Sequence, residues 1–264
     1  MRSRSRAVLL ALAVLALAPS LGVAQYAPKW HVGDWWVVKT CHESQSAAYI
    51  GPEPHWTWDE VRYEVTGVER VNHHNCFVLK ADYGAVYFLF YVLRDSWLII
   101  RYVTCSYDRH GKLVSHTHER PGGAYGAYIR APEPRLLRFP LQLGSHDTLF
   151  KLTTCWYVRE VPGIADSALL NHMLYEGDSA LGHVVRPNGT VYEVRSETPA
   201  DPPQPDGTVR GRILQSLQLW SEDLPWRLYE GLFTYYSTDS SNQHFEERSW
   251  LTAVGHSEKP LPQH

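Results

Sequence analysis

Apolar and polar side chains alternate along much of the chain, and this pattern predicts β-strands. The clearest run is Thr57 to Val68, in which Val61, Tyr63 and Val65 alternate with charged residues. A period of two places one row of side chains on a dry face of the strand and the other row in water. Further runs follow at residues 76–83, 86–93, 97–107 and 112–119. Short polar turns connect them, which predicts a meander of neighbouring antiparallel strands.

The second part of the chain carries a similar pattern. Strands are predicted at residues 149–161, 210–220 and 245–254, a short helix at residues 166–176 and a proline-rich loop at residues 121–140. Asn188-Gly189 lies between two apolar runs and predicts a β-hairpin, because both residues tolerate positive φ.

Together these elements predict a mainly β fold, a curved and mostly antiparallel sheet that forms a half-barrel or open barrel with one short helix. We expect one domain over residues 25–255, followed by a mobile tail at residues 256–264. A short sequence repeat suggests that the domain has two related halves, residues 25–120 and 138–255. In each half an apolar-x-apolar-Gly entry opens a strand that ends in Thr-Cys, at Cys41 and at Cys155.

Residues 86–103 depart from alternation, because Val86 to Leu93 is apolar at every position. Continuous apolarity indicates that both faces of these strands are covered. What covers them is either the protein core or an apolar, lipid-like ligand held in a cavity. The residues that would line such a ligand site are Tyr87, Phe88, Phe90, Tyr91, Ile99, Ile100, Trp220 and Trp226.

The N-terminus has the anatomy of a secretory signal peptide. Three arginines precede an unbroken apolar run from Ala7 to Ala18, and small residues lead to an expected cleavage site before Gln25. Twelve apolar residues are fewer than the roughly 20 of a spanning helix. We therefore expect residues 1–24 to be removed and the mature chain, which has no second apolar stretch of spanning length, to act outside the cytoplasm, in the periplasm or as a secreted protein.

Composition narrows the partners further. The chain has 264 residues and a formal charge of −3, and without the three arginines of residues 1–24 that charge becomes −6. A nucleic-acid binder needs a basic excess, so none is expected as a partner. Four cysteines, Cys41, Cys76, Cys105 and Cys155, permit two disulfides in an oxidising compartment. The repeat favours a Cys41–Cys155 bridge, with buried thiols as the alternative.

Motifs for catalysis are missing from the sequence. It contains no G-x-S-x-G, HExxH, P-loop or GxGxxG, so no catalytic residue and no cofactor is predicted. The best metal-like pattern is His116-Thr117-His118, whose two imidazoles share one face of a predicted strand. A zinc site needs three or four converging ligands, and no third is specified. A metal-dependent hydrolase is therefore only an alternative hypothesis.

Ten tryptophans offer another alternative. Exposed rings such as Trp220 and Trp226 would serve a sugar-binding or surface-binding module, whereas buried rings would anchor a large β core. The segment from Leu217 to Glu230 is the most distinctive in the chain. Its pattern predicts a strand followed by an aromatic-rich loop that packs over the mouth of the barrel.

Several short segments carry a resemblance to a known group of proteins. They are Trp30-His31-Val32-Gly33-Asp34-Trp35, Phe139-Pro140-Leu141-Gln142-Leu143-Gly144, Val65-Thr66-Gly67-Val68, Cys76-Phe77-Val78-Leu79, Leu224 to Tyr229 and Arg248-Ser249-Trp250-Leu251. In these the chain resembles uncharacterised exported bacterial β-proteins, which are similar to the periplasmic lipoprotein carriers. The resemblance implies an incompletely closed antiparallel sheet around a hydrophobic cavity, an apolar ligand or envelope partner, and no catalytic residues.

Overall fold

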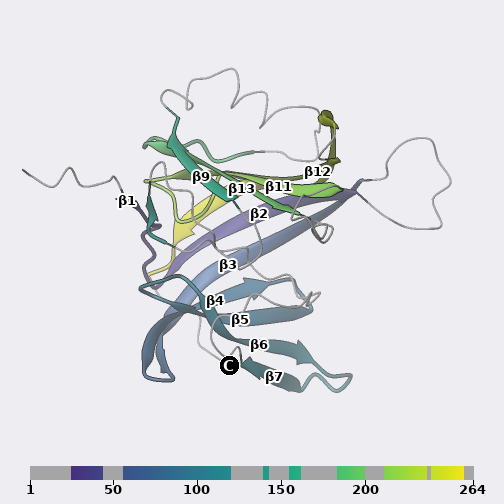
Figure 1. The fold of residues 1–264 in the computed structure, drawn as a ribbon. Coiled ribbons are helices and arrows are strands. Elements are labelled where there is room, and N and C mark those ends of the chain that lie inside the picture. The colour runs from purple at the N-terminus through teal and green to yellow at the C-terminus, as the bar shows by residue number, and fades with distance from the viewer. Residues whose placement is uncertain are drawn as a thin grey trace, which may run out of the picture.

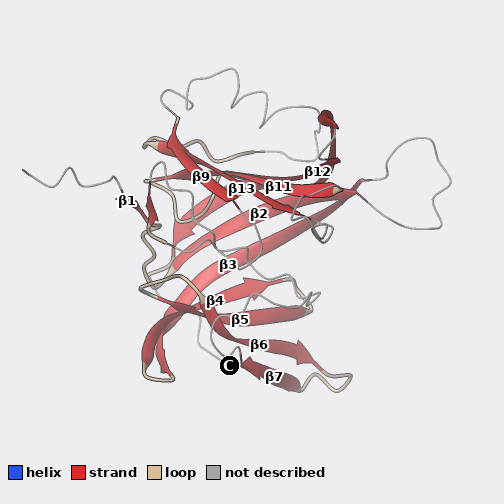
Figure 2. Ribbon diagram, in the orientation of Figure 1, coloured by secondary structure: helices blue, strands red, loops and turns tan. Residues whose placement is uncertain are grey.

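The computed structural model describes residues 25–43, 56–119, 139–142, 155–161, 183–199, 211–236 and 239–258. Every helix or strand assigned within these ranges is a strand (Figure 2). The strands are β1 (Gln25–Tyr26), β2 (Asp34–Glu43), β3 (Trp56–Val71), β4 (His74–Asp82), β5 (Val86–Leu93), β6 (Ile99–Tyr107), β7 (Leu113–Glu119), β8 (Leu141–Gln142), β9 (Cys155–Glu160), β10 (Val191–Pro199), β11 (Arg212–Ser221), β12 (Tyr229–Tyr236) and β13 (Asp239–His256). The mainly β prediction is confirmed, and the helix expected at residues 166–176 lies outside the described residues.

Eleven strands form one antiparallel sheet in the order β7-β6-β5-β4-β3-β2-β13-β12-β11-β10-β9. It consists of two meanders, β2 to β7 and β9 to β13, joined where β2 pairs with β13. The edge strands β7 and β9 do not pair with each other, so the sheet is open, as predicted. In Figure 1 strands β9 to β13 lie on one side and β4 to β7 on the other, with β2 and β3 between them. β1 and β8 form a separate two-stranded sheet.

The sheet is rolled around one of its faces. Phe139 contacts Trp97 in the β5–β6 turn and Trp220 on β11, with ring centroids 5.5 and 5.1 Å apart. β6 and β11 are seven places apart in the sheet order, so in a flat sheet their side chains would be about 30 Å apart. One ring reaches both only because the sheet curves. We call the enclosed side, which carries Trp36, Tyr63 and Trp220, the inner face, and the opposite side the outer face.

The two faces of β5 are covered to different extents. Phe88, Phe90 and Val92 are buried in the inner core. On the outer face Tyr91 is buried in a small cluster with Val71, Cys76 and Val78, whereas Tyr87, Leu89 and Leu93 are half-buried. The prediction of cover on both faces therefore holds fully for the inner face and only at Tyr91 for the outer face.

The turn before β6 is longer than the apolar pattern predicts. Trp97 lies in this turn rather than in the strand, with its N–H donating to the carbonyl of Leu93 at 2.9 Å. Its φ is 63°, a conformation that is unfavourable for a bulky side chain. Its ring is buried against Trp30, Phe77 and Phe139. The packing of the ring thus holds the turn in this conformation.

Two local predictions in the second meander are wrong. Asn188-Gly189 does not form a hairpin, since neither residue has positive φ and β10 pairs only with β9 and β11. Instead the Asn188 N–H donates to the Asp223 carboxylate at 2.7 Å. The other error concerns the end of the segment from Leu217 to Glu230, which is predicted to be a loop after its strand, whereas β12 begins at Tyr229. Its Gly-Leu-Phe-Thr-Tyr-Tyr sequence pairs with both β11 and β13.

The expected Cys41–Cys155 disulfide is not formed. Cys41, Cys76 and Cys105 are buried thiols. Cys41 lies near the end of β2 and Cys155 begins β9, with four strands between them in the sheet. A disulfide needs Cα atoms within about 7 Å, which strands this far apart do not provide. The two Thr-Cys repeats therefore do not place Cys41 and Cys155 next to each other in the structure.

Candidate functional site

Five aromatic side chains from outside the strands of the main sheet fill the inner face near one end. They are Tyr26 on β1, Trp30 before β2, Trp97 in the β5–β6 turn, Phe139 before β8 and Trp226 in the β11–β12 turn. All five are at most 5% exposed. We call this set the aromatic plug, because its rings occupy the space that the rolled sheet encloses at this end.

Trp30 lies at the centre of the plug. Its ring centroid is 4.5 Å from Trp97, 5.2 Å from Trp36 and 5.7 Å from Phe77. Its indole N–H donates to the carbonyl oxygen of Pro225 at 2.6 Å. Trp30 thus links the segment before β2 to the β11–β12 turn, and it does so through side-chain contacts rather than strand pairing.

A polar network crosses the inner face beside the plug. The indole N–H of Trp220 donates to Gln218 Oε1 at 2.8 Å, and Gln218 Nε2 donates to Glu230 Oε1 at 2.7 Å. Glu230 also forms an ion pair with Arg227, with 2.6 Å between Nη2 and Oε2. Gln218 is 2% exposed, Glu230 1% and Arg227 7%. The two buried charges therefore balance each other inside the sheet.

Tyr63 lies between this network and the plug. Its ring stacks on Trp36 and Trp226, with centroid distances of 5.8 and 5.2 Å. Burial raises the pKa of the Tyr63 hydroxyl, and the nearby Arg227 guanidinium only partly offsets this. The surroundings of Tyr63 therefore disfavour an additional negative charge.

Two indole donors at this site have no acceptor among the described residues. They are Nε1 of Trp36 and Nε1 of Trp226, on rings that are 0% and 1% exposed and stack 5.2 Å apart. By contrast, the indole N–H groups of Trp30 and Trp220 donate to the Pro225 carbonyl oxygen and to Gln218 Oε1. Buried donors are nearly always paired, so two unpaired neighbours mark a place where an acceptor fits.

The residues predicted to line a ligand site are divided between the two faces of the sheet. Phe88, Phe90, Ile99, Trp220 and Trp226 belong to the inner core. Tyr91 and Ile100 belong to the outer cluster, and Tyr87 lies on the same face, with Lys80 Nζ 4.8 Å above its ring. The eight residues therefore do not form one surface, because strand alternation separates neighbours.

The tryptophans predicted for sugar stacking are buried. Trp220 is 0% exposed and Trp226 is 1% exposed, so neither is an accessible platform. Trp35 is half-buried, with the Arg62 guanidinium 4.1 Å from its ring centroid. These positions favour the interpretation of the tryptophans as core anchors.

His116 and His118 are exposed on the edge strand β7. The His118 ring stacks on Tyr102, with centroids 4.4 Å apart. Within the described part of the chain, no group of three or more His, Cys, Asp or Glu side chains could hold a metal ion. The two imidazoles therefore gain no third ligand there.

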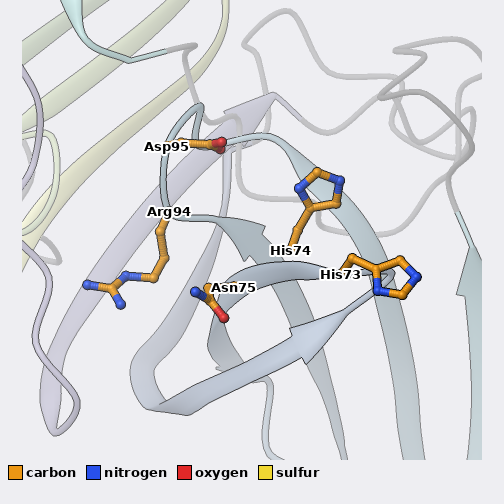
Figure 3. Close-up of a pocket in the computed structure, with 5 residues that line it drawn as sticks. All are labelled: His73, His74, Asn75, Arg94 and Asp95. Atoms are coloured by element: carbon orange, nitrogen blue, oxygen red, sulfur yellow. The ribbon is translucent and has the colours of Figure 1, made fainter.

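A groove of about 400 Å³ lies between the β3–β4 and β5–β6 turns. It is lined by His73, His74, Asn75, Arg94 and Asp95 (Figure 3). Asn72 and His73 form its hairpin turn, both with positive φ. Figure 3 shows the Arg94 side chain directed away from the two imidazoles, so the groups do not converge on one ligand position.

No protein-family model, curated protein or solved structure matches this chain. Among the described residues, no helix has the length and apolar character of a membrane span.

The predicted ligand-site residues do not include five residues of this site: Trp36, Tyr63, Gln218, Arg227 and Glu230. One signal was present, because Gln218 interrupts the run Leu217 to Trp220 and shares a strand face with Trp220. A polar residue at an inward-facing strand position predicts a buried hydrogen bond. Its partner Glu230 lies at the end of the segment predicted to be a loop, so the sequence pattern does not place it opposite Gln218.

Proposed function

We propose that this protein is an exported, non-enzymatic binding protein that holds an apolar, lipid-like ligand against the inner face of its rolled sheet. The observation that carries the proposal is that an open sheet presents an apolar inner wall, including Phe88, Phe90 and Ile99, covered at one end by rings from outside its strands. The N-terminal signal pattern supports action in the periplasm or outside the cell.

The open edge distinguishes this arrangement from a closed core. Because β7 and β9 are not paired with each other, the wall can widen without breaking a ladder of backbone hydrogen bonds. The aromatic plug can likewise shift without loss of main-sheet pairing, since none of its five residues lies on those strands. The short sequence segments that resemble those of lipoprotein carriers support extending the proposal to an envelope lipid as ligand or an envelope component as partner.

A fluorescent probe with an uncharged acyl chain, such as a pyrenyl-decyl methyl ester, tests the proposal. The mature protein should take up the probe saturably, and Phe88→Asp should abolish uptake because it places a charge on the inner wall. Leu89→Asp is the matched control, since Leu89 is the next residue but lies on the outer face. Circular dichroism should first show that both variants fold. Absence of saturable uptake by the native protein would remove the proposal.

A further inference from the structure

We propose that the indole N–H groups of Trp36 and Trp226 form a subsite for an uncharged oxygen acceptor of the ligand, such as an ester carbonyl. This inference rests on the proposed function and specifies the chemistry of its ligand. It identifies the ligand class as an acyl ester rather than a free fatty acid or a plain hydrocarbon.

The two donors are the basis of the subsite. Both Nε1 atoms are buried, neither has an acceptor among the described residues, and their rings stack 5.2 Å apart. A buried donor left without an acceptor loses its hydration without replacement, which costs free energy. An ester has two oxygens and a carbonyl oxygen has two lone pairs, so one ester group carries enough acceptor sites for two indole donors.

The charges around the subsite select a neutral acceptor. Arg227 lies 4.8 Å over the Trp226 ring, but its charge is matched by Glu230 at 2.6 Å. A carboxylate brought to this place would therefore be buried without an uncommitted cation, which is strongly unfavourable. Tyr63, stacked on both indoles, lies in surroundings that already oppose negative charge. An ester avoids this penalty and still accepts hydrogen bonds.

Access to the subsite depends on Trp30. Its ring contacts those of Trp36 and Trp226, at 5.2 and 6.1 Å, and it lies between β1 and β2, outside the strands of the main sheet. Its displacement breaks one side-chain hydrogen bond, to Pro225. An acyl chain in the place of the Trp30 ring would contact the same aromatic surfaces, with its ester at the two indoles.

Three probes that share one pyrenyl-decyl chain test the subsite: one ends in a methyl ester, one in a methyl group and one in a carboxylate. The native mature protein should bind the ester about tenfold more tightly than the hydrocarbon, as expected for one or two net hydrogen bonds. Trp36→Phe and Trp226→Phe should each reduce this preference by about threefold or more. Trp250→Phe is the control, because Trp250 is also buried but its ring packs elsewhere, against Trp58 and Tyr229.

Each other outcome has a distinct meaning. Equal affinity of the native protein for ester and hydrocarbon, or a preference that survives both substitutions, would overturn the subsite and leave the proposed function standing. Tightest binding of the carboxylate probe would overturn the assignment of a neutral acceptor. Binding of none of the probes would remove the proposed function as well. If a variant does not fold, the ratio measured on the native protein still decides.

Discussion

The inner faces of the two meanders share a topology but differ in chemistry. On β4 and β5 the inner face is apolar, with Leu79 and Phe90 fully buried. On β11 to β13 it carries the buried polar side chains Gln218, Glu230 and Ser249. The first meander is held by dispersion and burial, and the second also depends on a hydrogen-bonded ion pair.

This difference shows where specificity lies. An apolar wall accepts any chain of suitable width, whereas directed donors discriminate between ligand ends. Trp36 on β2 and Trp226 in the β11–β12 turn lie where the two meanders meet. A ligand with an apolar chain and a polar end would therefore be oriented at the boundary between the apolar inner wall and the polar network.

The largest expected effect on stability comes from substitution in the apolar inner face of β5. Phe90→Ala should lower the free energy of unfolding by about 4 kcal/mol, because it removes a fully buried ring and leaves a cavity. Leu89→Ala, on the half-buried outer side of the same strand, should cost clearly less. Urea unfolding of the two variants measures the contrast, and similar losses would show that the faces are not distinct.

The polar network should respond almost as strongly. Glu230→Ala should cost about 3 kcal/mol, because it leaves the Arg227 guanidinium buried without its counter-charge. Glu60→Ala removes an exposed carboxylate 3.7 Å from Lys39 and should change stability by less than about 1 kcal/mol. Urea unfolding of both variants checks this, and a negligible effect at Glu230 would contradict a charge balance inside the sheet.

A smaller effect is expected at Asp223 beside the network. Burial tends to raise the pKa of this carboxyl, but hydrogen bonds from the Ser221 hydroxyl and the N–H groups of Asn188 and Gly189 outweigh it and lower the pKa. A lowered folded pKa stabilises the protein above the unfolded value of about 3.9, and this contribution is lost as pH falls through the folded pKa.

Asp223→Asn should therefore cost about 1 kcal/mol at pH 7, a modest value because the carboxylate is exposed. The difference between native protein and variant should shrink as the pH falls below about 4. Urea unfolding at several pH values measures it. A difference that stays constant down to pH 2 would show that the carboxylate charge is not responsible.

Strand patterning predicted most of the first meander correctly. The run Val86 to Leu93 matches β5 residue for residue, because a long apolar run between turn residues has few other conformations available. Trp97 was misplaced because its backbone conformation is imposed by rings distant in sequence, Trp30 and Phe139. Local pattern carries no information about such contacts.

The site was harder to predict than the fold for the same reason. Trp36 and Trp226 come into contact only once β2 pairs with β13 and the sheet rolls. Asn188-Gly189 shows that a strong local turn signal can also mislead, because the Asn188 N–H bonds to the distant Asp223 carboxylate instead of closing a hairpin. Long-range pairing, rather than composition, decides which side chains share the inner face.

Quenching of tryptophan fluorescence by a brominated acyl ester tests the central claim most directly, because bromine quenches only the rings that the acyl chain contacts. The account predicts saturable quenching of the buried inner tryptophans at one ester per chain, lost in Phe88→Asp and retained in Leu89→Asp. Quenching that rises linearly with ester concentration and is the same in all three proteins would contradict a ligand site on the inner face.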